Sequence, residues 1–273
     1  MKPKIVKTYK EYQDLVSLYF TQKEYTNDYI QADVKYYISN NLLYEYHTNY
    51  NLFLFVEKEI SDGNKGYRVY YYISNTDEIA DFSELTNLVV EIIYRGDGYF
   101  PQAEIDYLCK CGFSINLIRD QYYGIYKDLT RSSDVDNIFV EYASNITEVE
   151  NACNLFNSSF DVLSGDYIPE RYHRQLLDNG LILIAKNKQG EFLGALHQKV
   201  DKGIAWISHL AVLPEARGMH VGQALLDIFV NNNYTSDKQR YMLWVQHQNN
   251  SAVMMYTKKG FRYLNKSTIS LIK

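Results

Sequence analysis

The chain has 273 residues, of which 46% are hydrophobic, and its formal net charge is −5. That length allows two modest domains with buried cores, and the acidic balance argues against nonspecific nucleic-acid binding, which needs a basic face. No apolar stretch is long enough for a signal peptide or a membrane span, and three irregularly spaced cysteines do not make a disulfide framework. Cys109 and Cys111 lack a second pair that would complete a zinc site. These observations predict a cytoplasmic protein without a metal centre.

The first half of the chain is expected to form three strands, one helix and then a hairpin-like pair of strands. Apolar-rich segments flank the turn sequence D-G-N-K-G, which favours a pair of antiparallel strands. In chain order, the expected elements are strands at 51–59, 67–75 and 88–94, a helix at 102–110, and a hairpin-like pair at 113–119 and 122–128. The segment 130–137 has no apolar periodicity and predicts a domain boundary, which divides the chain into residues 1–130 and 131–273.

The second half is expected to contain three consecutive strands between helices. Asn145 is a suitable helix N-cap after a strand at 138–142, and Pro169 suits the first turn of a second helix. Turns rich in Gly, Lys and Asn favour an antiparallel meander for the strands. These strands are expected at 181–187, 191–200 and 204–212, followed by a helix from about 221, a strand at 240–246, a helix ending near 259, and a closing hairpin at 261–272.

The most informative segment is V-L-P-E-A-R-G-M-H-V-G, from Val212 to Gly222, between a predicted strand and a predicted helix. A glycine-containing turn before a helix leaves several backbone N–H groups without a partner. Together with the helix dipole, these groups favour binding of an anionic pyrophosphate. The loop therefore predicts a site for a phosphate-bearing cofactor.

A second motif follows about thirty residues later, N-x-x-A-x-x-x-Y-x-x-x-G-F. Its positions are Asn249, Ala252, Tyr256, Gly260 and Phe261. With the preceding loop it resembles the GCN5-related N-acetyltransferase (GNAT) family, whose loop pattern is R/Q-x-x-G-x-G/A. The resemblance implies an α/β (α+β) fold with a mixed, mostly antiparallel central sheet flanked by helices. One position departs from the pattern, because His220 stands where the family has its first glycine.

The resemblance implies acetyl-CoA as the acyl donor and assigns roles by position. The end of the strand would pair with the pantetheine arm, the loop would enclose the pyrophosphate, and Asn249 would bond the arm or simply cap its helix. Tyr256 would give a proton to the leaving thiolate, with core packing as the alternative, and Ser208 would border the acceptor site. The donor-binding positions are Leu210, Ala211, Val212, Arg217, Gly218, Met219, His220, Val221, Gly222, Gln223 and Asn249.

The general base cannot be read from the sequence. Strand alternation places Trp206 and Ser208 on one face and Ile207 and His209 on the other. His209 and His197 have a suitable ordinary pKa, but alternation leaves open whether they face the acceptor or the core. In the family, the connection at 158–168, which contains Phe160, Asp161, Gly165, Asp166 and Tyr167, lies over the acceptor site.

The strand–helix–Gly–Phe order occurs twice, which suggests two tandem GNAT-like domains. The first half has no glycine between Asn75 and Leu88, and carries Asp77, Glu78, Asp81 and Glu84 there instead. Carboxylates at that place would repel a pyrophosphate. We therefore expect a degenerate N-terminal half and one acetyl-CoA site, in the C-terminal half.

The function predicted from these motifs is transfer of an acetyl group from acetyl-CoA to a primary amine of a small molecule or peptide, by direct attack. The alternative is a noncatalytic acyl-CoA-binding or interaction module, which His220 and the unidentified base leave open. Neither a nucleic acid nor a membrane is expected as a partner, and the oligomeric state is not readable.

Overall fold

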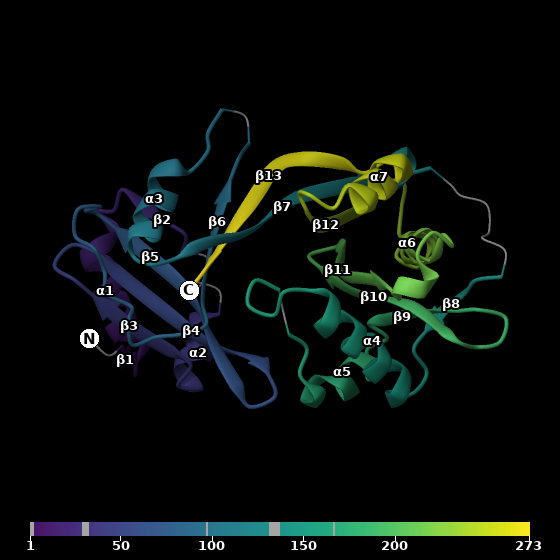
Figure 1. The fold of residues 1–273 in the computed structure, drawn as a ribbon, viewed down its shortest axis with the longest axis horizontal. Coiled ribbons are helices and arrows are strands. Elements are labelled where there is room, and N and C mark those ends of the chain that lie inside the picture. Colours follow the sequence, from purple (N-terminus) through teal and green to yellow (C-terminus); the bar gives the residue numbers. More distant parts are fainter. Residues whose placement is uncertain (1–2, 29–32, 97, 131–136, 166) are drawn as a thin grey trace. The chain divides into compact units, whose positions relative to one another are not determined.

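The computed structural model describes residues 3–28, 33–96, 98–130, 137–165 and 167–273 (Figure 1). The chain forms two compact units. The N-terminal unit comprises Met1–Ile118, Val162–Asp166 and Ser267–Lys273, and the C-terminal unit comprises Arg119–Asp161 and Tyr167–Lys266. No helix in the described part of the chain combines the length and the apolar character needed to cross a membrane.

The N-terminal unit is built on a sheet with the strand order β1-β3-β4-β5-β6-β13, and β2 pairs with β5. All of these pairs are antiparallel except β5–β6, which is parallel. The elements from the first half of the chain are β1 (Lys4–Ile5), α1 (Tyr9–Phe20), β2 (Tyr25–Thr26), α2 (Val34–Ser39), β3 (Leu43–His47), β4 (Leu52–Ser61), β5 (Asn64–Ile73), β6 (Leu88–Tyr94), α3 (Gln102–Lys110) and β7 (Ser114–Ile125).

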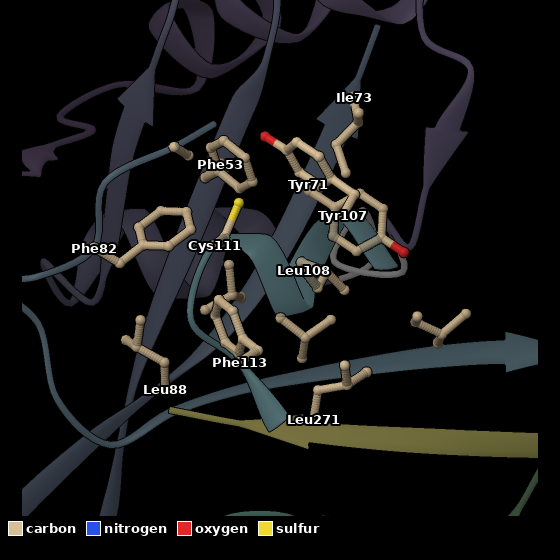
Figure 2. Packing of buried hydrophobic residues seen from close by; sticks show 14 of the residues in the cluster. Phe53, Tyr71, Ile73, Phe82, Leu88, Tyr107, Leu108, Cys111, Phe113 and Leu271 are labelled. Carbon is tan, nitrogen blue, oxygen red and sulfur yellow. The ribbon is translucent and has the colours of Figure 1, made fainter. Parts of the chain in front are cut away.

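Aromatic side chains fill the core of the N-terminal unit. Figure 2 shows Phe53, Tyr71 and Phe82 gathered with residues of α3. Phe82 meets Phe53 edge to face, with the ring centroids 4.9 Å apart. Leu271 of β13 lies in the same cluster, so the last strand of the chain completes this core. Burial of these side chains contributes the main stabilisation of the unit.

The C-terminal unit has the strand order β7-β12-β11-β10-β9-β8, with β11–β12 parallel and the other pairs antiparallel. Helices cover both faces of this sheet. Its elements are β8 (Phe139–Tyr142), α4 (Ile146–Ser159), α5 (His173–Asp178), β9 (Ile182–Lys186), β10 (Phe192–Asp201), β11 (Ile204–Val212), α6 (Val221–Asn232), β12 (Arg240–Gln246), α7 (Asn250–Lys259) and β13 (Arg262–Ile272). The predicted fold class, a mixed and mostly antiparallel sheet flanked by helices, is confirmed.

Two separate hydrophobic clusters distinguish the faces of the C-terminal sheet. Leu183 of β9 packs with α6 and α7, whereas its neighbours Ile182 and Ile184 pack with α4 and α5. This alternation is the period of two expected of a strand that is covered on both sides. We call these the α6/α7 face and the α4 face of the sheet (Figure 1).

Both predicted hairpins are wrong, because each segment is one continuous strand. Residues 119–125 of β7 pair with β12 in the C-terminal unit, and residues 267–272 of β13 pair with β6 in the N-terminal unit. Neither segment contains a two-residue turn such as Asn-Gly. Asn265 has a left-handed φ of +54°, but it is a single residue in the strand and makes no turn. Each unit therefore receives a strand segment from the other half of the chain.

These exchanges make the two units differ from a linear division at residues 130 and 131. The N-terminal unit also takes part of the connection between α4 and α5. The Lys58 Nζ donates to the carbonyl of Gly165 at 3.2 Å, and the Asn116 amide donates to the Ser164 hydroxyl at 2.8 Å. Residues 131–136, at the predicted boundary, and Asp166, a predicted residue of the acceptor loop, lie outside the described residues.

Candidate functional site

A β-bulge interrupts β11 at Ser208. In the register with β10, His197 lies opposite His209 and Gln198 lies opposite Ile207, which leaves Ser208 as an extra residue. The bulge reverses the expected alternation: Ile207 packs on the α6/α7 face, whereas His209 stacks on Phe156 of α4. Ile207 and His209 were predicted to share a face, and the structure corrects this.

β11 and β12 stop pairing at the same place. Their parallel register runs from Ile204 opposite Arg240 to Ile207 opposite Leu243 and goes no further. On its other edge β11 continues to pair with β10 as far as Val212. Within the described residues, the edge of β11 from 208 to 212 therefore has no strand partner on the β12 side. The three predicted positions on this edge, Leu210, Ala211 and Val212, can offer backbone donors and acceptors to an extended ligand.

The predicted anion loop follows directly. A 3₁₀ turn, Pro214–Ala216, leads to Gly218 with φ +82°, and α6 begins at Val221. The amide of Met219 donates to Ala216, but no backbone acceptor among the described residues takes the amides of Gly218, His220, Val221 and Gly222. Their N–H groups lie at the positive end of the helix dipole. The side chains of Arg217, Met219 and His220 are exposed, and Gln223 lies half-buried in the first turn of α6.

Gly222 allows the start of α6 to pack closely on the end of β11. A Cβ atom at this position would lie 3.2 Å from the Met255 Sδ and 3.5 Å from the Leu210 Cδ2. A side chain at this position would have to displace the Met255 side chain, so the glycine leaves room for this close packing. His220 lies in the left-handed region, with φ +63° and ψ 16°, and its side chain makes no capping hydrogen bond. The one departure from the glycine pattern thus falls where the backbone conformation favours glycine.

Replacing His220 with glycine should stabilise the protein by about 1 kcal/mol, because a left-handed non-glycine residue costs roughly that amount. The free energy of unfolding in urea measures the effect. Lys202, with φ +49° in the exposed turn between β10 and β11, provides the matched control. Lys202→Gly should give a similar gain without changing ligand affinity at the loop. An unchanged or lower stability of His220→Gly would mean that the imidazole makes a compensating contact.

Tyr256 lies in the hydrophobic cluster on the α6/α7 face. Its side chain is 5% exposed and its ring meets Phe261 edge to face, with centroids 5.8 Å apart. Burial raises the pKa of the Tyr256 phenol well above its ordinary value of 10.0. Its hydroxyl makes no hydrogen bond to another described residue. The phenol is therefore neutral at physiological pH, and packing alone does not require its oxygen.

Asn249 caps α7. Its side-chain oxygen accepts a hydrogen bond from the amide of Ala252 at 3.1 Å, as the capping interpretation predicted. Its side-chain nitrogen has no partner in the part of the chain that the structure describes, so it remains able to donate to a carbonyl. Gly260 ends the helix in the left-handed conformation, with φ +105°. The two ends of the second motif thus have clear structural roles.

Replacing Asn249 with alanine should lower the free energy of unfolding by about 1 kcal/mol, the usual effect of losing an N-cap. Replacing it with aspartate keeps a capping oxygen but removes the free amide donor. Thermal unfolding measures the role of Asn249 as a helix cap, and acetyl-CoA titration measures its role as an amide donor to the ligand. Asn249→Asp should keep the stability of the wild type and bind acetyl-CoA more weakly. Equal affinity of Asn249→Asp and wild type would leave Asn249 as a helix cap alone.

The N-terminal unit has a different connection at the corresponding place. The segment 74–87, between β5 and β6, contains no helix and therefore no helix N-terminus. The carboxylate of Glu78 accepts hydrogen bonds from the Thr48 hydroxyl and from the amides of Asn49 and Tyr50. These bonds hold its pKa below the usual range, although partial burial acts in the opposite direction. The negatively charged Glu78 carboxylate therefore already accepts from these donors, and the segment 74–87 offers no anion site of the kind predicted after β11.

Sequence reasoning missed two features of this region. The first is the bulge at Ser208, which no residue type in the sequence indicates. Ser208 itself is half-buried at the point where β11 and β12 separate. The second feature is a direct contact between His197 and His209, whose Nδ1 atoms are 3.2 Å apart. Among the described residues, no three His, Cys, Asp or Glu side chains gather in a way that could hold a metal ion.

Comparisons with known proteins agree with this geometry. Residues 178–263, which include β11, the loop, α6 and α7, match the family model of the acetyltransferase (GNAT) domain. The predicted resemblance to the GNAT family is thus confirmed for this segment of the chain. No curated protein matches the chain.

Solved structures show the same fold at low sequence identity. A GCN5-related N-acetyltransferase from Sphaerobacter thermophilus is 14% identical, with a TM-score of 0.56, over 82% of this chain and 76% of that one. A GNAT-family acetyltransferase from Colwellia psychrerythraea is 14% identical, with a TM-score of 0.51, over 100% of this chain and 99% of that one. A Drosophila protein is 13% identical, with a TM-score of 0.55, over 99% of this chain and 98% of that one. The fold of the present chain is therefore that of N-acetyltransferases.

Proposed function

We propose that the C-terminal unit binds acetyl-CoA and transfers the acetyl group to a primary amine of a small molecule or peptide. The observation that carries this proposal is the separation of β11 from β12 at the Ser208 bulge, directly before a loop of unpaired amides. An extended arm that ends in a pyrophosphate needs this combination, an open strand edge followed by anion donors. The predicted cytoplasmic location is part of the same proposal.

Most of the predicted donor-binding residues have a physical role in this arrangement. The backbone of Leu210, Ala211 and Val212 pairs with the amide groups of the pantetheine arm. The amides of Gly218, His220, Val221 and Gly222 donate to the pyrophosphate oxygens, where the helix dipole adds to the attraction. The free amide nitrogen of Asn249 donates to a carbonyl of the arm. Exposed Arg217 supplies positive charge at the rim of the loop.

The chemistry then requires a proton donor for the sulfur. As the amine nitrogen attacks the thioester carbonyl, the C–S bond breaks and the sulfur leaves as a thiolate. Tyr256 gives its phenolic proton to this thiolate, because its raised pKa keeps the phenol protonated at neutral and mildly alkaline pH. Ser208, at the bulge, borders the place where the acceptor amine approaches.

Release of free thiol from acetyl-CoA tests this function. The full chain is incubated with acetyl-CoA and a panel of primary amines, including amino acids, polyamines, amino sugars and peptides. We expect thiol release that depends on one class of amine and saturates with its concentration. Binding of acetyl-CoA without thiol release for any amine would favour the alternative, a noncatalytic acyl-CoA-binding module.

A further inference from the structure

His197 and His209 form a contact between two imidazole rings on the α4 face of the C-terminal sheet. Their Cα atoms are register partners on β10 and β11. The Nδ1 atoms are 3.2 Å apart, the ring centroids 5.4 Å apart, and the ring planes differ by 13°. The centroid distance exceeds the nitrogen distance by 2.2 Å, which is about two ring radii. The two nitrogens therefore lie between the ring centres, and the rings meet edge to edge in nearly one plane.

This geometry fits one shared proton. One Nδ1 must carry the hydrogen and the other must accept it, so the rings adopt opposite tautomers when both are neutral. A first added proton converts the pair to imidazole and imidazolium and keeps a charge-assisted hydrogen bond. A second added proton would make both rings positive, with their two Nδ1–H donors pointing at each other, which is strongly unfavourable. The pair can thus hold one added proton but not two, and its rings behave as a coupled unit.

Aromatic side chains hold the pair in place. His209 is 9% exposed, and its ring lies against Phe156 at 5.3 Å and Phe160 at 5.1 Å between centroids. His197 is half-buried and pairs across the sheet with Ile182 of β9. Two other ionisable side chains on the elements of this face are buried: Cys153, whose pKa burial raises to about 12, and His173 of α5. The others are Tyr142 of β8, Glu150 of α4, Asp161 after α4, Lys199 and Asp201 of β10, the Arg174–Asp178 ion pair of α5, and Lys186, which pairs with Glu141 and Glu148.

The pair lies next to the opening of the sheet. His209 follows Ser208, the residue at which β11 leaves β12. The imidazoles are on the α4 face, whereas Tyr256 belongs to the cluster on the α6/α7 face. A thioester held at the opening would have a proton acceptor on one side of the sheet and a proton donor on the other. Direct attack by an amine needs both groups at once.

We propose that His197 and His209 act together as the proton acceptor for the amine, an inference that rests on the proposed acetyl transfer. The ammonium group gives one proton to the imidazole pair, and the free amine attacks the thioester carbonyl. The C–N bond forms, the C–S bond breaks, and Tyr256 gives its proton to the sulfur. The attacking nitrogen then loses a second proton, which returns Tyr256 to its protonated form. The imidazole pair releases the first proton to water. The products are an N-acetyl amide, free CoA thiol and one proton.

Histidine-ring NMR of the unliganded protein tests the shared proton without any need for activity. The ¹⁵N shifts of both rings are followed between pH 5 and pH 9, with His47→Gln, an exposed histidine of the N-terminal unit, as the control. We expect both rings to respond to a single protonation, and the His197→Asn variant to change the titration of His209. Two independent titrations, each unaffected by substitution of the other histidine, would overturn the shared proton.

Kinetics test the role of the pair in transfer. Asparagine places an amide near the position of Nδ1 but does not titrate, so His197→Asn and His209→Asn preserve a hydrogen bond. Each variant should lower kcat about 100-fold at pH 7 and leave acetyl-CoA affinity unchanged. The loss should shrink as the pH rises and the amine deprotonates by itself, and the double variant should be no slower than either single variant.

Multiplicative losses, or a loss independent of pH, would overturn the assignment. If His209→Asn does not fold, half-exposed His197→Asn carries the test by itself. A wild-type protein that binds acetyl-CoA but acetylates no amine would overturn both the proposed function and this role of the pair. Transfer that survives in His197→Asn at neutral pH would overturn the role of the pair alone.

Discussion

Replacing Gly222 with aspartate is expected to abolish acetyl-CoA binding while the protein remains folded. The new Cβ would lie 3.2 Å from the Met255 Sδ, a flexible side chain that can shift. The carboxylate would lie at the N-terminus of α6, where it is favourable for the helix but repels a pyrophosphate. We expect a loss of affinity of about 100-fold or more, about 3 kcal/mol, measured by calorimetry.

The matched control is Gly222→Ala, which adds the same Cβ without the charge. Its affinity should fall much less than that of Gly222→Asp, because only the Met255 side chain needs to move. Circular dichroism and the urea midpoint check that both variants fold. Wild-type affinity of a folded Gly222→Asp protein would contradict the assignment of the loop to the pyrophosphate.

Replacing Tyr256 with phenylalanine is expected to lower kcat by about 100-fold, the usual contribution of a positioned acid. Acetyl-CoA affinity and stability should change little, because the hydroxyl makes no hydrogen bond to another described residue. Burial raises the pKa of the phenol, so the neutral donor persists as the pH rises through its ordinary value of 10.0. Ionisation of Tyr256 should therefore cause no loss of wild-type activity between pH 7 and about pH 10.

Tyr241 supplies the control for this variant. It is buried in the same cluster, and its hydroxyl donates to the carbonyl of Val230 at 2.8 Å. Tyr241→Phe should lower the free energy of unfolding by about 1 kcal/mol and leave kcat unchanged. An unchanged kcat in Tyr256→Phe would remove Tyr256 from the mechanism and leave it as a residue of the core.

Local sequence signals predicted the local structure of the site well. The strand before the loop, the start of α6, the Asn249 cap and the Gly260 end of α7 all lie where capping and turn preferences placed them. These features depend on a few neighbouring residues, so a short segment contains the information that determines them.

Features that depend on pairing between distant segments were not predictable. The continuation of β7 and β13 into the other unit depends on the strands with which they pair, β12 and β6. No residue within either segment indicates these pairing partners. The bulge at Ser208 likewise arises from the register with β10. Because one extra residue reverses every later side chain, simple alternation placed His209 and Ile207 on the same face. The His197–His209 contact likewise follows from the register between β10 and β11, which the sequence alone does not define.

Calorimetric titration of the full chain with acetyl-CoA measures directly how many acyl-CoA sites the protein has. We propose one acyl-CoA site, at the loop before α6, and none at the connection 74–87. We expect the wild-type chain to bind one acetyl-CoA and the Gly222→Asp variant to bind none. Absence of binding to the wild-type protein, or one molecule still bound per chain in the folded Gly222→Asp variant, would contradict this proposal.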